Sequence, residues 1–137
     1  MAHNVDRSLA GLKILLMEDE VDVREILAIL LRLAGAEVSE VSSVAEALAS
    51  YDRQRPDCIL SDLNLNHDGF VLLETIRARE PGSSAITPAI ALTGRVFAED
   101  RARALAAGFR TYLTKPVDPP ELLRAILEAT RGASPEP

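Results

Sequence analysis

The sequence has no tryptophan, and only 4% of its 137 residues are aromatic, although 47% are hydrophobic. A core with so few rings is largely aliphatic, which favours helices packed on a sheet over a β-sandwich. A chain of this length also corresponds to one domain with a sizeable core. The sequence therefore predicts a single α/β domain.

The chain also lacks a cysteine pair and any long apolar run. Its one cysteine, Cys58, lies inside a short apolar run, so we expect a buried, reduced thiol. No stretch approaches the roughly 18 consecutive apolar residues that would span a bilayer, and the polar N-terminus has no apolar signal core. These absences predict a cytoplasmic protein that is not inserted in a membrane.

Clusters of basic residues are absent as well. The 15 Lys and Arg residues are scattered among 21 Asp and Glu residues, giving a formal net charge of -6. Nucleic acids and anionic membranes are bound by clustered positive charge, so we expect no direct contact with nucleic acid. The composition of the two ends predicts polar tails over 1–10 and 132–137, around a domain spanning 11–131.

Apolar runs alternate with segments of helical periodicity along the whole chain. Capping boxes precede two of the expected helices, Ser43 with Glu46 and Asp118 with Glu121. Strict alternation predicts a doubly wound α/β fold with a parallel sheet and helices on both faces. The predicted strands are 13–17, 36–41, 57–62, 88–94 and 110–115, and the predicted helices are 21–34, 44–51, 70–79, 98–107 and 119–131.

Polar side chains stand where four of the predicted strands end. In a doubly wound sheet, functional groups gather beyond the carboxyl ends of the strands. The residues at these ends are Glu18 and Asp19, Asp62, Thr93 and Lys115. We therefore expect three carboxylates, a hydroxyl and an ammonium group to lie close together.

Three carboxylates at one rim need a cation. At 4 Å and an effective dielectric near 20, each pair of like charges repels by about 4 kcal/mol. A ligand set made only of oxygen atoms favours Mg²⁺ over Zn²⁺. Such a site suits phosphoryl transfer, in which a carboxylate can be the covalent acceptor. Asp62, at the end of the central run, is the predicted acceptor.

Four motifs together resemble those of response-regulator receiver domains of two-component phosphorelays. They are the acidic pair in "LLMEDE", the aspartate in "ILSDLNL", the threonine in "IALTG" and the lysine and proline in "YLTKP". The resemblance covers about 12–131. It implies a flavodoxin-like (βα)5 fold with strand order 2-1-3-4-5, and a signalling phosphoacceptor rather than a metabolic enzyme.

The resemblance also implies the chemistry of the site. Asp62 would accept phosphate from a phosphohistidine on a histidine kinase or a histidine phosphotransfer protein. Glu18, Asp19, Asp62 and the backbone carbonyl of Asn64 would hold Mg²⁺. Thr93 and Lys115 would contact the phosphate.

Further implications concern the loop after the last strand and the output face. The peptide between Lys115 and Pro116 would be cis. Tyr112 would be the switch residue that moves inward when the threonine engages phosphate, with a half-buried core tyrosine as the alternative. The face formed by 98–107, 110–115 and the last helix would meet a downstream protein or a second copy, and helix 21–34 resembles the surface that receives the phosphodonor.

The sequence departs from the family after Asp62. Asn66 replaces a common proline, Gly69 follows Asp62 by seven residues rather than eight, and Gly94 replaces a more usual alanine. A receiver-like interaction module that is never phosphorylated is therefore an alternative. An aspartyl-phosphate phosphatase is another, although no substrate-selecting cap is present. We expect a stand-alone receiver, or one excised from a hybrid sensor kinase or a longer regulator.

Overall fold

The structure is a computed structural model that describes residues 7–63, 68–80, 86–94 and 98–131. Strands and helices alternate through this part of the chain, as the periodicity predicts. The elements are β1 (Lys13–Met17), α1 (Val21–Leu33), β2 (Glu37–Val41), α2 (Val44–Arg53), β3 (Cys58–Asp62), α3 (Asp68–Arg79), β4 (Ala89–Thr93), α4 (Ala98–Ala107), β5 (Thr111–Thr114) and α5 (Pro119–Arg131).

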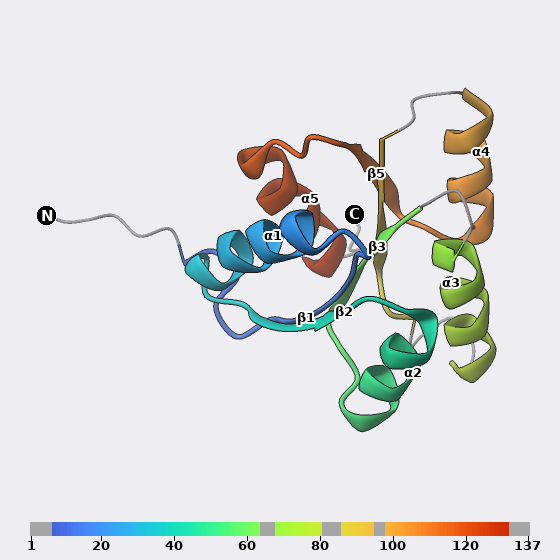
Figure 1. Cartoon of the computed structure of the whole chain (residues 1–137), viewed down its shortest axis with the longest axis horizontal. Coiled ribbons are helices and arrows are strands. Elements are labelled where there is room, and N and C mark those ends of the chain that lie inside the picture. The colour runs from blue at the N-terminus through green and yellow to red at the C-terminus, as the bar shows by residue number, and fades with distance from the viewer. Residues whose placement is uncertain (1–6, 64–67, 81–85, 95–97, 132–137) are drawn as a thin grey trace, which may run out of the picture.

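The five strands form one parallel sheet in the order β2-β1-β3-β4-β5, which confirms the flavodoxin-like, doubly wound fold. Helices α1 and α5 cover one face of the sheet, and α2, α3 and α4 cover the other (Figure 1). The order reverses between β1 and β3, where α1 and α2 leave on opposite faces. This is the position at which doubly wound sheets carry their sites.

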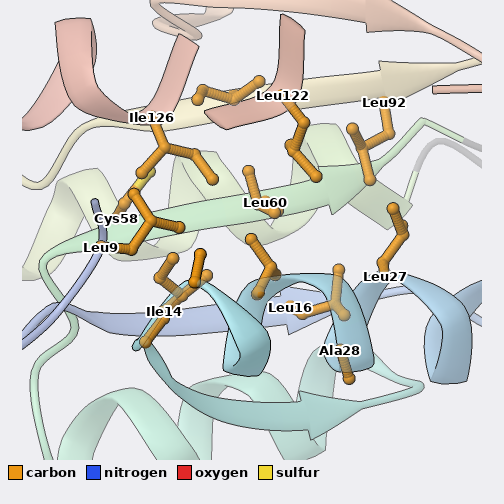
Figure 2. Close-up of a cluster of buried hydrophobic side chains, with 14 of the residues drawn as sticks. Leu9, Ile14, Leu16, Leu27, Ala28, Cys58, Leu60, Leu92, Leu122 and Ile126 are labelled. Carbon is orange, nitrogen blue, oxygen red and sulfur yellow. The ribbon is translucent and has the colours of Figure 1, made fainter. Parts of the chain in front are cut away.

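The central strands contribute side chains to two hydrophobic cores, one on each face of the sheet. Along β1, Ile14 and Leu16 point toward α1, and they belong to the core cluster that also contains Leu122 and Ile126 of α5 (Figure 2). Leu15, between them, packs on the opposite face in the core under α2, α3 and α4. Because successive side chains of a strand point to opposite faces, a strand buried on both sides reads as a continuous apolar run.

The edge strands β2 and β5 are only partly buried, which explains the weak apolar pattern of 36–41. Cys58 in β3 is buried, as predicted, and burial raises the pKa of its thiol to about 12. The longest helices, α1 and α5, have 13 residues each. Within the described residues, none of the helices has both the length and the apolar character needed to cross a bilayer.

The segment predicted to be a polar tail, 1–10, contains a core residue. Leu9 is 0% exposed, and its backbone N–H donates to the carbonyl of Ala34 at 2.9 Å. Gly35 makes this packing possible, because a Cβ atom there would lie 2.9 Å from Cα of Ala10. A single leucine in a mostly polar segment has no periodicity, so the pattern did not reveal it. The packed structure therefore begins before residue 11.

The N-cap hydrogen bond of each predicted capping box forms. Ser43 Oγ accepts a hydrogen bond from the Glu46 N–H at 3.2 Å, and Asp118 Oδ2 accepts one from the Glu121 N–H at 3.1 Å. The reciprocal bond of the first box goes to Ser42 instead of Ser43, because Glu46 Oε1 accepts from the Ser42 N–H at 2.9 Å. Helix α3 begins at Asp68, two residues earlier than predicted.

A buried carboxylate links three segments near the start of β4. Glu80 has a side chain that is 2% exposed. It accepts hydrogen bonds from the Tyr51 hydroxyl at 2.8 Å and the Thr87 N–H at 3.1 Å. Arg77 lies 2.8 Å from one carboxylate oxygen and Arg55 lies 3.2 Å from the other. These contacts join α2, α3 and the segment that precedes β4.

We expect Glu80→Gln to lower the free energy of unfolding by about 1–3 kcal/mol at neutral pH, because buried charge-assisted hydrogen bonds are lost. Burial opposes ionisation of Glu80, but the hydrogen bonds from Thr87 and Tyr51 outweigh burial and hold its pKa below the ordinary 4.5. The contribution is therefore present above pH 4.5 and is lost as the pH falls through the lower folded pKa. Urea unfolding across this pH range measures both effects.

The control is Asp52→Asn. The Asp52 carboxylate pairs with Arg79 at 3.1 Å on the surface, where such pairs contribute about 0–1 kcal/mol. An equal loss of stability in the two variants would contradict the role assigned to Glu80.

Candidate functional site

The pairing of the strands brings the predicted site residues to one rim of the sheet. Asp62 ends β3 and lies opposite Leu92 of β4. Thr93 ends β4 and lies opposite Thr114, which ends β5. Lys115 follows directly, and its N–H donates to the carbonyl of Thr93 at 2.8 Å. Three neighbouring strands therefore present a carboxylate, a hydroxyl and an ammonium group side by side.

The loop after β1 adds two more carboxylates. Oxygen atoms of Glu18, Asp19 and Asp62 all lie within 4.8 Å of one another. The side chain of Glu18 is 0% exposed, Asp62 is buried and Asp19 is exposed. The structure thus assembles the acidic cluster that the strand ends predict.

Lys115 is the cation that pairs with this cluster. Its Nζ lies 2.7 Å from Glu18 Oε1, 2.9 Å from Asp62 Oδ1 and 3.7 Å from Glu20 Oε1. Burial favours the neutral form of Lys115, but the contacts with Glu18 and Asp62 outweigh burial and raise the pKa of the ammonium. The lysine is therefore charged at neutral pH.

One ammonium does not balance the cluster. Burial raises the pKa of Glu18 and of Asp62, although Lys115 opposes the shift in both cases. Glu18 Oε1 is fully buried and lies 2.7 Å from the Lys115 ammonium. The cluster has more negative charge than this one ammonium neutralises.

These features fit a hard divalent cation. Mg²⁺ takes oxygen ligands and is usually held in proteins by one or two carboxylates, with water or phosphate oxygens in its other positions. Glu18, Asp19 and Asp62 supply such ligands. The fourth predicted ligand, the backbone carbonyl of Asn64, lies outside the residues that the structure describes.

Hydrogen bonds hold the Glu18 backbone at its N–H and at its carbonyl, and a third holds its side chain. Its N–H donates to the carbonyl of Val41 at 3.1 Å, and its carbonyl accepts from Arg24 Nη1 at 2.9 Å. Glu18 Oε2 accepts from the Glu20 N–H at 3.1 Å. Sequence reasoning missed Arg24. The available signal was a basic residue in the first turns of a helix, where the helix dipole disfavours positive charge.

Two predicted residues lie at or near the rim without belonging to the carboxylate cluster. Thr93 is buried at the end of β4. Tyr112 is half-buried, packs against the core under α2, α3 and α4, and lies with its ring centroid 5.1 Å from the guanidinium carbon of Arg101. The peptide between Lys115 and Pro116 is cis, as predicted.

Gly69 at the start of α3 packs directly against the segment that carries Asp62. A Cβ atom at this position would lie 2.7 Å from the backbone oxygen of Asp62 and 2.6 Å from Cδ2 of Leu63. Real Cβ contacts are not this short, so a larger residue here would force the backbone of Asp62 or the start of α3 to shift.

Residues 14–127 match the family described as response regulator receiver domain. An uncharacterized 14.6 kDa protein of Leptolyngbya boryana is 40% identical over 121 residues, which are 88% of this chain and 91% of that protein. The chain spans about half the length of several transcriptional regulatory proteins that it matches at 32–34% identity.

Two solved receiver-domain structures share the fold, one with a bound magnesium ion and one in complex with a phosphotransfer protein. The receiver domain of a Pseudomonas aeruginosa sensor histidine kinase, with a magnesium ion coordinated in its active-site cleft, is 37% identical with a TM-score of 0.79, covering 90% of this chain and all of that one. The Saccharomyces cerevisiae receiver domain of Ssk1, crystallised with the histidine phosphotransfer protein Ypd1, is 27% identical with a TM-score of 0.80, covering 89% and 90%. With its parallel sheet, its acidic rim and this match over most of its length, the chain belongs to the response regulator receiver domains of two-component signalling.

Proposed function

We propose that this domain accepts a phosphoryl group on Asp62 from a phosphohistidine donor, with Mg²⁺ held by Glu18, Asp19, Asp62 and the backbone carbonyl of Asn64. The observation that carries the proposal is the placement of Asp62, which is buried at the end of β3, 2.9 Å from the Lys115 ammonium and within an acidic cluster. The magnesium ion in the related Pseudomonas aeruginosa domain supports the same assignment.

In the proposed transfer a carboxylate oxygen of Asp62 attacks phosphorus and forms the new P–O bond. The P–N bond to the donor imidazole breaks, and its electron pair returns to the ring nitrogen. Glu18, Asp19 and Asp62 would hold Mg²⁺, which would supply positive charge to offset the charge of the phosphoryl oxygens. Lys115 and the Thr93 hydroxyl neutralise and orient those oxygens as charge develops on them.

The donor partner is proposed to be a histidine kinase or a histidine phosphotransfer protein. Helix α1 begins four residues after β1, beside the acidic cluster, and carries exposed apolar side chains at Ile26, Ile29 and Leu33. Their spacing places them on one helix face, which suits packing against a helix of the donor.

We expect Ile29→Asp to slow uptake from a phosphorylated histidine phosphotransfer protein and to leave uptake from acetyl phosphate unchanged.

The output is proposed to be a change in the face formed by α4, β5 and α5, with Tyr112 as the switch residue. A groove of about 520 Å³ lies between β5 and α5 and is lined by residues that include Tyr112, Arg110 and Glu128. Its mixed charges suit binding of a downstream protein or a second copy of the domain.

The proposed function also includes a cytoplasmic location, in which the Cys58 thiol stays reduced.

The first experiment is the intact mass of the wild-type domain after incubation with acetyl phosphate. We expect one phosphate adduct in the presence of Mg²⁺ and none after chelation, because the acidic cluster repels an anionic donor without the cation. A folded domain that binds Mg²⁺ yet never gains mass would contradict uptake from this small donor. That result would favour a phosphate-independent interaction module.

A further inference from the structure

Arg24 stands at an unfavourable place for a positive charge. It is the fourth residue of α1, and the amino end of a helix favours anions over cations. Helix α1 also begins without a side-chain cap, because Glu20 at its N-cap accepts no such hydrogen bond. A basic residue in this setting calls for a specific partner.

The partner is the loop that carries the acidic pair. Arg24 Nη1 donates to the backbone carbonyl of Glu18 at 2.9 Å, in a part-buried contact. Arg24 Nε lies 3.7 Å from Glu40 Oε1 on the edge strand β2. Arg24 thus bridges the backbone of Glu18 and a carboxylate of the neighbouring strand.

A second arginine completes the chain of contacts. Arg32, two turns further along α1, lies with Nη1 2.8 Å from Glu40 Oε2 and donates from Nη2 to the Val38 carbonyl at 3.0 Å. Arg32 therefore shares Glu40 with Arg24 but makes no hydrogen bond or ion pair with Glu18 in the part of the chain that the structure describes. It offers a matched control.

We propose that Arg24 is a positioning residue for the metal site: its guanidinium, oriented by Glu40, holds the Glu18 backbone so that the Glu18 and Asp19 carboxylates stay in ligand geometry. The proposal rests on the Mg²⁺ site of the proposed function. Groups that orient metal ligands without binding the metal commonly contribute 10- to 100-fold to metal affinity.

The direction in which Mg²⁺ affinity changes when Arg24 is replaced distinguishes a positioning role from a purely electrostatic one. Removing a positive charge beside a cation site strengthens Mg²⁺ binding by electrostatics alone. Loss of positioning weakens binding instead. Titration calorimetry with MgCl₂ on the wild type, Arg24→Ala, Arg24→Lys and Arg32→Ala distinguishes the two.

We expect Arg24→Ala to weaken Mg²⁺ binding by about 10-fold, at the lower end of the range for such orienting groups. Arg24→Lys keeps the charge but loses the planar fork that reaches both partners, so it should weaken binding as well. Arg32→Ala should bind like the wild type. Unchanged or tighter binding in both Arg24 variants would overturn the proposal, as would an equal loss in Arg32→Ala.

Two outcomes are kept apart from these. If the wild type binds no Mg²⁺, the proposed function itself is refuted. If the wild type binds Mg²⁺ and both Arg24 variants bind it with the same affinity, only the positioning role is refuted. If both Arg24 variants fail to fold, Glu40→Gln tests the same bridge from its other end. It should weaken Mg²⁺ binding, and wild-type affinity in that variant would then overturn the proposal.

Discussion

Asp62→Asn is expected to unfold at a higher temperature than the wild type when divalent cations are chelated, and to take up no phosphate from acetyl phosphate. Burial raises the pKa of Asp62, so at neutral pH its charge weakens the folded state relative to the unfolded one. The amide removes that charge beside Glu18 and Asp19. We expect a gain of about 0.5–2 kcal/mol, and each kcal/mol raises the unfolding temperature by about 4 °C in a domain of this size.

The gain should depend on pH in a definite direction. The folded pKa of Asp62 lies above its ordinary value of 3.8, so its charge destabilises the folded protein fully above the folded pKa. The destabilisation disappears as the pH falls toward 3.8. The difference in free energy of unfolding between Asp62→Asn and the wild type should therefore shrink toward zero in acid.

Mg²⁺ should reverse the order of stability. A ligand that binds only the folded state stabilises it by an amount that grows with concentration, and Asp62→Asn lacks one of the three carboxylates. Thermal unfolding with and without Mg²⁺, together with intact mass, measures both arms, and Asp52→Asn serves as a carboxylate control on the surface. An Asp62→Asn protein that is less stable than the wild type under chelation, or that still gains phosphate, would contradict the assignment.

The architecture was largely predictable because each strand and helix carries its own periodicity. Strands β1, β3 and β4 are buried on both faces and have continuous apolar sequences. Ser43 and Asp118 are N-cap residues that indicate where the following helices begin. The strand order could not be predicted in this way. Periodicity does not say which strand lies beside which, so the predicted order, which the structure confirms, came from the resemblance to a family.

The site was predictable to the extent that it lies at strand ends. A parallel sheet brings these ends together, so Asp62 and Lys115 were found without any knowledge of their contacts. Arg24 was missed because it binds a backbone carbonyl, and such a contact requires no particular residue type at the accepting position. Leu9 was missed because one buried side chain makes no pattern.

Gly69→Ala is expected to damage both the stability and the chemistry of the domain. The new methyl group would meet the backbone oxygen of Asp62 at 2.7 Å and Leu63 Cδ2 at 2.6 Å. Leu63 can change rotamer, but the oxygen belongs to the backbone that carries the acceptor. Alanine is favoured over glycine in helices by up to about 1 kcal/mol, and overpacking of this kind costs about 1–3 kcal/mol, occasionally more. We expect a net loss of about 2 kcal/mol in urea unfolding.

The same clash should slow phosphate uptake, because relief of the contact requires Asp62 or the start of α3 to move. A displacement of about 1 Å at a reacting group can lower a rate about 100-fold, so we expect a 10- to 100-fold slower gain of mass from acetyl phosphate. Gly94→Ala is the matched control, since a Cβ atom there meets none of the residues that the structure describes within 4 Å. It should change the free energy of unfolding by less than about 0.5 kcal/mol. Wild-type stability and uptake in Gly69→Ala would show that the start of α3 can move away from Asp62 freely, and would contradict this prediction.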